Sequence, residues 1–245
     1  MDSKIVVYGV EFLRALRAAL AVATRKEPRD FIQFRVIDET LYVCASTGWD
    51  SVMVEVPTEF VDMDDKRDSF FEISRAEATV LSAMKVKVED KEFQPLLGIL
   101  VHEFSIQLAD ESGIGIPVRA VKVRRSQPIY ESQLGNIPRA IDEVFANSPT
   151  DSAPCMKPQQ WKMAGQVASI MQTNFAVWTD SSLEATVIRN IILGDDVKMV
   201  MMTSIADAEE KPDEAEVQEP EYVNVPLALE PPRKMIEAVP LGGIS

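Results

Sequence analysis

Hydrophobic and polar positions follow two different periods along this chain. Over residues 9–26, apolar side chains recur every three to four positions, which places them on one side of an α-helix. The same spacing predicts helices over residues 74–84, 137–147 and 157–171. Elsewhere, short aromatic and β-branched runs alternate with polar residues, a pattern that is typical of strands.

The alternating runs predict strands over residues 31–37, 40–46, 51–57, 70–73, 86–89, 99–104, 105–109, 114–121, 175–179, 183–189 and 197–203. Residues 60–68 are interpreted as an acidic connection. The order of helix, strands, helix and strands occurs once in full and again in shortened form, which is a weak internal repeat. This order predicts an α+β fold, in which a few helices pack on antiparallel sheets.

The C-terminal segment differs from the rest in composition. Residues 206–245 contain ten acidic and three basic residues and show little apolar pattern, so we expect this tail to be disordered. The tail contributes half of the net charge of −14. A moderately acidic body can still carry a basic surface, because screening limits each charged patch to neighbours within about 10 Å.

The residue inventory argues against catalysis. The two cysteines, Cys44 and Cys155, are far apart and make no metal-ligand spacing, so we expect buried, unreactive thiols. The single histidine, His102, lies in a predicted strand and is interpreted as structural. The sequence contains no nucleophile–base pair and no glycine-rich phosphate loop. It also has no membrane-spanning run and no signal peptide. We therefore expect an intracellular, cytoplasmic, non-enzymatic protein without a metal or cofactor.

The first two predicted helices carry basic side chains on faces that are otherwise made of small residues. The basic side chains on and next to these faces are Arg14, Arg17, Arg25, Lys26, Arg75 and Lys85. Long basic side chains attract phosphates without reading base sequence, and this attraction weakens with salt. Taken alone, such faces are more often ordinary solvated surfaces.

Four stretches, residues 12–20, 41–48, 105–130 and 184–202, resemble the bacterial-type sliding clamp, the processivity subunit of the replicative DNA polymerase. The last stretch, which resembles the final two strands of a clamp, carries the resemblance best. In that family, helices line the hole of a ring around duplex DNA and antiparallel sheets face outward. The resemblance therefore implies a sliding-clamp fold. It divides the chain into a clamp-like domain at 1–126, a shortened second domain at 127–205 and the tail at 206–245.

This sequence departs from the family at two places. A clamp domain has four strands between its two helices, whereas only about ten residues separate the predicted helices 137–147 and 157–171. The second domain is therefore truncated or remodelled, which leaves ring closure and subunit number open. Met202 stands where the family ending usually has proline.

The resemblance implies a non-sequence-specific processivity factor that encircles double-stranded DNA as a homo-oligomeric ring, near the nucleoid. It makes the six basic residues named above the candidate DNA-facing residues. Polymerase and clamp loader would bind through short peptides, and a compact, divergent clamp would suit a bacteriophage. The implied peptide groove comprises Gly48, Trp49, Val52, Pro128, Met199, Val200, Met201 and Met202. Methionine suits a surface that accepts several partners, although without the family such a cluster is more often core.

The shortened second domain leaves another function open. The chain could be a clamp-like interaction protein that binds replication proteins or a clamp without encircling DNA. An enzyme is the third and least favoured class.

Overall fold

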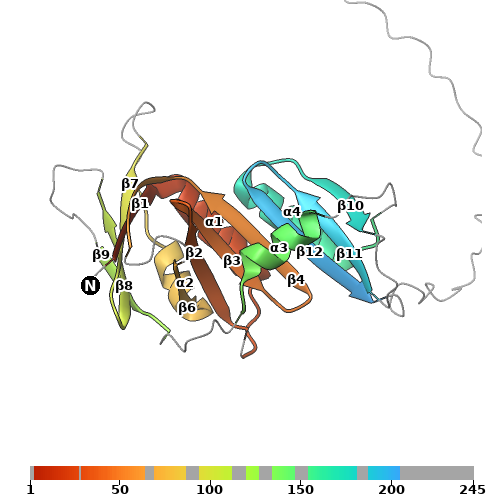
Figure 1. Cartoon of the computed structure of the whole chain (residues 1–245), viewed down its shortest axis with the longest axis horizontal. Helices are drawn as coiled ribbons and strands as arrows, with labels where there is room; N and C mark the ends of the chain where they lie inside the picture. The colour runs from red at the N-terminus through yellow and green to blue at the C-terminus, as the bar shows by residue number, and fades with distance from the viewer. Residues whose placement is uncertain are drawn as a thin grey trace, which may run out of the picture. The chain divides into compact units, whose positions relative to one another are not determined.

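The computed structural model describes residues 3–27, 29–63, 69–86, 94–111, 120–126, 134–146, 154–180 and 187–204. The chain divides into two units, residues 1–210 and 211–245. The second unit lies wholly outside the described residues, as does the predicted tail. All the elements below belong to the first unit (Figure 1).

A five-stranded antiparallel sheet is built entirely from the N-terminal half of the chain. Its strands lie in the order β5-β1-β7-β8-β9. Their bounds are β1 Ser3–Tyr8, β5 Thr58–Asp62, β7 Leu96–Val101, β8 Ser105–Asp110 and β9 Ala120–Arg124. β5 and β9 are the two edges of this sheet.

A seven-stranded antiparallel sheet contains the other strands, in the order β10-β11-β12-β4-β3-β2-β6. Their bounds are β2 Phe31–Ile37, β3 Thr40–Ser46, β4 Asp50–Val56, β6 Ser69–Ser74, β10 Ala176–Asp180, β11 Val187–Leu193 and β12 Val197–Ser204. β12 pairs with β4, so that Met199 lies opposite Val52. One sheet therefore contains strands from both predicted domains.

The two faces of this sheet are covered by different helices (Figure 1). On one face, α1 (Gly9–Val22) packs on β3 and β4 and contacts both α2 (Arg75–Ser82) and α4 (Pro158–Met171). We call this the inner face. On the opposite, outer face, α3 (Ile137–Phe145) contacts β3, β4 and β12. Successive strand residues point to alternate faces, so each strand supplies side chains to both layers.

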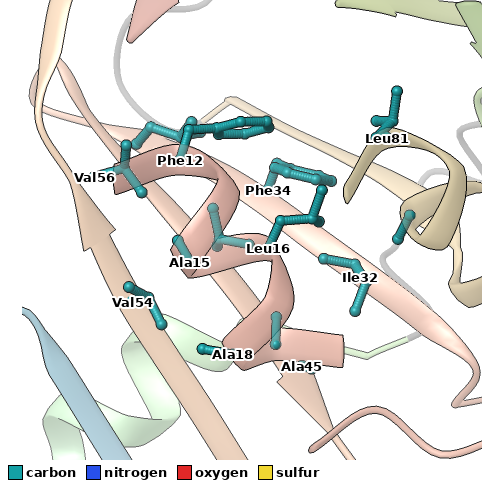
Figure 2. Packing of buried hydrophobic residues seen from close by; sticks show 14 of the residues in the cluster. Phe12, Ala15, Leu16, Ala18, Ile32, Phe34, Ala45, Val54, Val56 and Leu81 are labelled. Carbon is teal, nitrogen blue, oxygen red and sulfur yellow. The ribbon is translucent and has the colours of Figure 1, made fainter. Parts of the chain in front are cut away.

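The main core lies between the inner face, the helices and the five-stranded sheet. Phe34 stacks between Phe12 of α1 and Phe71 of β6, with ring centroids 6.2 and 4.7 Å away. Ala15 and Ala18 are fully buried on the side of α1 that faces the sheet (Figure 2). Their small side chains let the helix backbone approach the strands closely, while larger neighbours fill the space on either side.

Most predicted elements are present, with shifted ends. The strands predicted at 31–37 and 40–46 match β2 and β3, and all four predicted helices exist. α1 ends at Val22 rather than residue 26, because Ala23 has extended backbone angles (φ −54°, ψ 129°). The strand predicted at 183–189 is β11, which is described over Val187–Leu193. Most of the predicted strands 86–89 and 114–121 lies outside the described residues.

Two strands were not predicted. β1 is a central strand of the five-stranded sheet, between β5 and β7. β5 overlaps the acidic connection expected at residues 60–68, and that interpretation is wrong for residues 60–62. Its side chains Glu59, Phe60 and Asp62 are exposed. An edge strand can carry charged residues, and these hide the alternation of apolar and polar residues by which a strand is identified in a sequence.

Candidate nucleic-acid interface and outer apolar strip

Two arginines of α1 connect the inner helices to one another. Arg14 and Arg17 lie one turn apart, on the side of α1 away from the sheet. Arg14 Nη2 donates to Gln172 Oε1 at the end of α4 (2.9 Å). Arg17 Nη2 donates to the carbonyl of Ser82 at the end of α2 (3.1 Å). Both side chains remain at least partly accessible to solvent.

The other four predicted basic residues extend the same surface along α1 and α2. Arg75 Nε donates to the carbonyl of Ala23, just after α1 (3.2 Å). Arg25 and Lys26 follow α1 and are exposed, as is Lys85 after α2. Among the described residues, none of the six predicted cations has a carboxylate within ion-pair distance. Their positive charge is therefore not neutralised by a described side-chain partner.

The helix segments of the inner face carry charge of the opposite sign to the whole chain. We define the helix layer as residues 9–27, 74–86 and 157–172. It contains eight basic residues, Arg14, Arg17, Arg25, Lys26, Arg75, Lys85, Lys157 and Lys162. It contains three acidic residues, Glu11, Glu27 and Glu77. Glu77 is engaged in the capping box of α2. The net charge of the chain is −14, so this layer is a local basic surface on an acidic protein.

A buried glutamine fastens α4 to the inner face. Gln160 Nε2 donates to Asp50 Oδ1 (2.7 Å) and to the carbonyl of Met202 (3.1 Å). Gln160 Oε1 accepts from Thr203 Oγ1 (2.9 Å). Burial raises the pKa of the Asp50 carboxyl, and hydrogen bonds from Gln160 and Thr47 oppose this shift. These contacts fix the N-terminal turn of α4 over β4 and β12.

The outer face carries a second, smaller apolar cluster. We call it the outer strip, and it consists of Tyr42, Cys44, Met53, Val200 and Met202, from β3, β4 and β12. α3 covers it with Ile137 and Ile141, both almost fully buried, and with Leu134, Val144 and Phe145 at its margins. Burial strongly raises the pKa of the Cys44 thiol above its ordinary value, so the thiol is neutral and unreactive.

A second buried glutamine fastens the N-terminus of α3 to the outer face. Gln33 Nε2 donates to the carbonyl of Gly135 (2.7 Å), and Gln33 Oε1 accepts from the backbone N–H of Ile137 (3.4 Å). Gln33 also donates to Glu72 Oε1 (3.0 Å) and accepts from Arg35 Nε (3.1 Å). The Gln33 side chain therefore binds both a carbonyl and an N–H of the backbone that leads into α3.

Charge and aromatic contacts hold the C-terminal half of α3. Lys198 Nζ lies 2.7 Å from Asp142 Oδ1 and 5.5 Å from the centroid of the Phe145 ring. The Phe145 ring meets the edge of Trp178 of β10, with centroids 6.1 Å apart and planes at 75°. The indole Nε1 of Trp178 is buried and has no hydrogen-bond acceptor in the described part of the chain.

The structure divides the predicted groove between the two faces. Val200 and Met202 belong to the outer strip, and Trp49 lies beside it, since its carbonyl accepts from the Met202 N–H (2.9 Å). Trp49 is 54% exposed. Gly48 has a φ of 95° in the turn between β3 and β4, where the Arg29 guanidinium would overlap any Cβ.

The remaining predicted groove residues do not form an outer surface. Val52, Met199 and Met201 are fully buried in the main core on the inner face, because they alternate with Met53 and Val200 along their strands. Pro128 lies outside the described residues. Sequence reasoning missed that α3 covers the strip and that Gln33 anchors it. The repeat of Ile137, Ile141 and Phe145 signalled an apolar helix face, but not which surface it meets.

Metal-ligand groups and membrane-spanning helices are both lacking in the described ranges. No cluster of three or more His, Cys, Asp or Glu residues there is arranged to hold a metal ion. No helix among these residues has the length and apolarity to cross a membrane. The candidate sites are therefore the basic helix layer and the outer strip.

No protein-family model matches the sequence, and no curated protein matches it. Its structure is similar to solved sliding clamps. For the PCNA of A. fulgidus, solved with the C-terminal region of FEN-1, the TM-score is 0.53 at 11% identity, over 82% of this chain and 97% of that chain. For the DNA polymerase III beta subunit of Thermotoga maritima the TM-score is 0.55 at 12% identity, over 86% of this chain and 66% of that chain.

The beta clamp of Helicobacter pylori, solved with a DNA ligase peptide, gives a TM-score of 0.53 at 13% identity, over 90% of this chain and 70% of that chain. These similarities show that the chain has the predicted α+β sliding-clamp fold. The chain spans about two thirds of the length of these bacterial clamps.

Proposed function

We propose that this protein is a DNA sliding clamp, a processivity factor that encircles double-stranded DNA and tethers a replicative polymerase. The observation that carries the proposal is the reversal of charge on the helix layer. This layer contains eight basic and three acidic residues, although the whole chain has a net charge of −14. Such a surface attracts phosphates without reading bases. The acidic remainder repels DNA and so favours this one surface.

Encirclement requires several copies of the chain, joined edge to edge. β9 and β10 each lie at one edge of a sheet, and the described residues form no further strand beyond either of them. Unpaired strand edges readily pair with another chain. Pairing of β9 with β10 of the next copy would build a homo-oligomeric ring in which every subunit contributes its helix layer to the same side.

Binding of protein partners is the second part of the proposal. The PCNA of A. fulgidus was solved with the C-terminal region of FEN-1, and the Helicobacter pylori clamp with a ligase peptide. By analogy, polymerase and clamp loader would bind this chain through short peptides. The outer strip, with Trp49 beside it, is the proposed surface. The protein would act by binding, without a cofactor, in the cytoplasm near the nucleoid.

Retention on circular DNA tests encirclement. Purified protein is loaded on nicked circular plasmid, and the complex is passed over a sizing column before and after the plasmid is linearised. We expect retention on the circle and loss from the linear form, together with a concentration-dependent increase of mass in sedimentation. Equal retention on both forms, with a monomer at all concentrations, would rule out a ring.

The shortened second domain favours one other function, a clamp-like protein that binds replication proteins or a clamp without encircling DNA. α3 ends at Phe145 and α4 begins at Pro158, which leaves no room for the four strands of a full clamp domain. A monomer that shows no topological retention on DNA but binds clamp-targeting peptides would support this alternative.

A further inference from the structure

α3 packs on the outer strip in the manner of a bound ligand rather than as a part of the main core. The strip and α3 form a cluster of five buried residues that is separate from the main core. The inner face of the same strands already holds that core, so the sheet does not depend on α3. With nine residues, α3 is also shorter than the roughly 12–15 residues that an isolated helix needs to be even marginally stable.

Each contact that holds α3 is one that a separate peptide could reproduce. Gln33 binds only backbone atoms of the incoming segment, at Gly135 and Ile137. Lys198 accepts any acid at the position of Asp142, and the aromatic end meets Trp178. The strip itself is rich in methionine and sulfur, which adapt to different apolar side chains.

We propose that the outer strip is a docking surface for a short amphipathic helix of a protein partner, and that α3 occupies this surface in cis as an intramolecular competitor. α3 serves as the template for the partner segment. The segment carries an aliphatic residue at a first position and at i+4, an acid at i+5 and an aromatic residue at i+8, as in Ile137, Ile141, Asp142 and Phe145. The inference rests on the proposed function, which already assigns the outer strip to peptides of replication proteins. It adds that α3 competes for this surface in cis.

Because α3 competes in cis, a partner can bind only the molecules in which α3 is displaced. The apparent affinity of the partner is the intrinsic affinity multiplied by the fraction of such molecules. If that fraction is about 1%, the partner binds about 100-fold more weakly than it would bind the open strip. Partners that reproduce the contacts of α3 poorly would then be excluded. The covering helix therefore sets a threshold for binding, and weakening it should strengthen partner binding.

Cys44 is a built-in reporter of this opening. Its thiol is fully buried beneath α3, and the other cysteine, Cys155, can be replaced by serine so that only Cys44 is measured. In the Cys155→Ser background, we compare Ile141→Asp, which puts a charge under α3, with Ala140→Asp, which puts the same charge on the exposed side of the helix. The readout is the rate of reaction with a thiol reagent, beside the thermal unfolding midpoint.

We expect Ile141→Asp to accelerate labelling of Cys44 at least tenfold while far-UV circular dichroism still reports a folded protein, and Ala140→Asp to leave the rate unchanged. A synthetic peptide of residues 134–146 is then added in trans. We expect it to restore protection of Cys44 in the Ile141→Asp protein, whereas the same peptide with Ile137 and Ile141 replaced by aspartate does not.

Labelling of Ile141→Asp only at the rate of global unfolding would overturn the inference, because α3 would then be an inseparable part of the fold. Failure of the 134–146 peptide to protect Cys44 in an opened protein would overturn it as well. If Ile141→Asp does not fold, Phe145→Ala replaces it, since that change removes only the aromatic end of the cover. These readouts involve no DNA, so loss of circular-DNA retention would contradict the proposed ring while leaving the docking surface intact.

Discussion

The two faces of the seven-stranded sheet are built from alternate residues of the same strands, yet they serve different ends. On the inner face, α1, α2 and α4 enclose the main core and carry a basic outer surface. On the outer face, a single short helix supplies two residues of a five-residue buried cluster and covers the other three, which belong to the sheet. The difference shows that burial alone does not identify a core. The extent of a buried cluster, and whether the sheet depends on it, decide whether a covering element can leave.

Both faces nevertheless use the same device to position a helix. Gln160 holds the start of α4 to β4 and β12, and Gln33 holds the backbone before and at the start of α3. A buried amide that satisfies neighbouring polar groups fixes one orientation, because losing it leaves those groups without partners. The faces therefore differ in apolar area rather than in how their helices are aligned.

The largest effect should come from the inner core. Phe34→Ala removes the ring that stacks between Phe12 and Phe71, and the cavity cannot readily collapse because both neighbouring rings are themselves buried and packed. We expect a loss of about 3–5 kcal/mol in the free energy of unfolding, measured by urea denaturation. A loss below about 1 kcal/mol would mean that the inner cluster is not the main stabilising core.

A similar truncation on the outer face should cost less. Ile141 is as deeply buried as Phe34, at 1% exposure each. However, α3 can leave the strip, so the global cost of Ile141→Ala cannot exceed the free energy with which α3 docks. We expect about 1–2 kcal/mol by urea denaturation, below the usual 2–5 kcal/mol for such a truncation. A loss equal to that of Phe34→Ala would contradict the difference between the faces.

How much the sequence predicted also differs between the faces. The periodicity of α1 separated its buried residues from Arg14 and Arg17, because one strong helical period runs through this helix. That the six basic residues face DNA stays a prediction. The outer groove was predicted only in part. A run such as Met199 to Met202 is apolar at every position, so no period assigns its residues to a face, and three of the predicted groove residues lie in the inner core.

Long-range pairing was the other feature that sequence could not supply. The position of α3 over β3, β4 and β12 depends on the pairing of β12 with β4, two strands that are about 150 residues apart. The edge strand β5 was hidden by its exposed polar residues. Local patterns therefore identified the elements, whereas tertiary pairing decided which residues form each surface.

The basic surface of the inner face should dominate DNA binding. We expect the double variant Arg14→Ala with Arg17→Ala to weaken binding to duplex DNA and to flatten the plot of log affinity against log salt. Each arginine that contacts phosphate should reduce the slope by about 0.9. Fluorescence anisotropy at several salt concentrations measures both quantities.

Arg139→Ala is the control, because it removes one arginine charge, against two in the double variant, from the exposed side of α3 on the outer face. Its side chain is 76% exposed, so its loss should leave the fold intact. If this variant flattened the salt dependence by half as much as the double variant does, the assignment of DNA to the inner face would fail.

The smallest effect concerns the polar anchor of the inner face and depends on pH. Burial raises the pKa of the Asp50 carboxyl, so the folded protein binds the carboxyl proton more tightly than the unfolded chain does. Ionised Asp50 therefore destabilises the fold at neutral pH, and this penalty is relieved as the pH falls through the raised pKa.

Asp50→Asn keeps an oxygen acceptor for Gln160 but carries no charge. We expect it to stabilise the protein by up to about 1 kcal/mol at neutral pH, with the gain narrowing toward acid pH, as measured by urea denaturation across pH. A gain that widened toward acid pH would show that the carboxylate stabilises the anchor, and that the hydrogen bonds from Gln160 and Thr47 outweigh its burial.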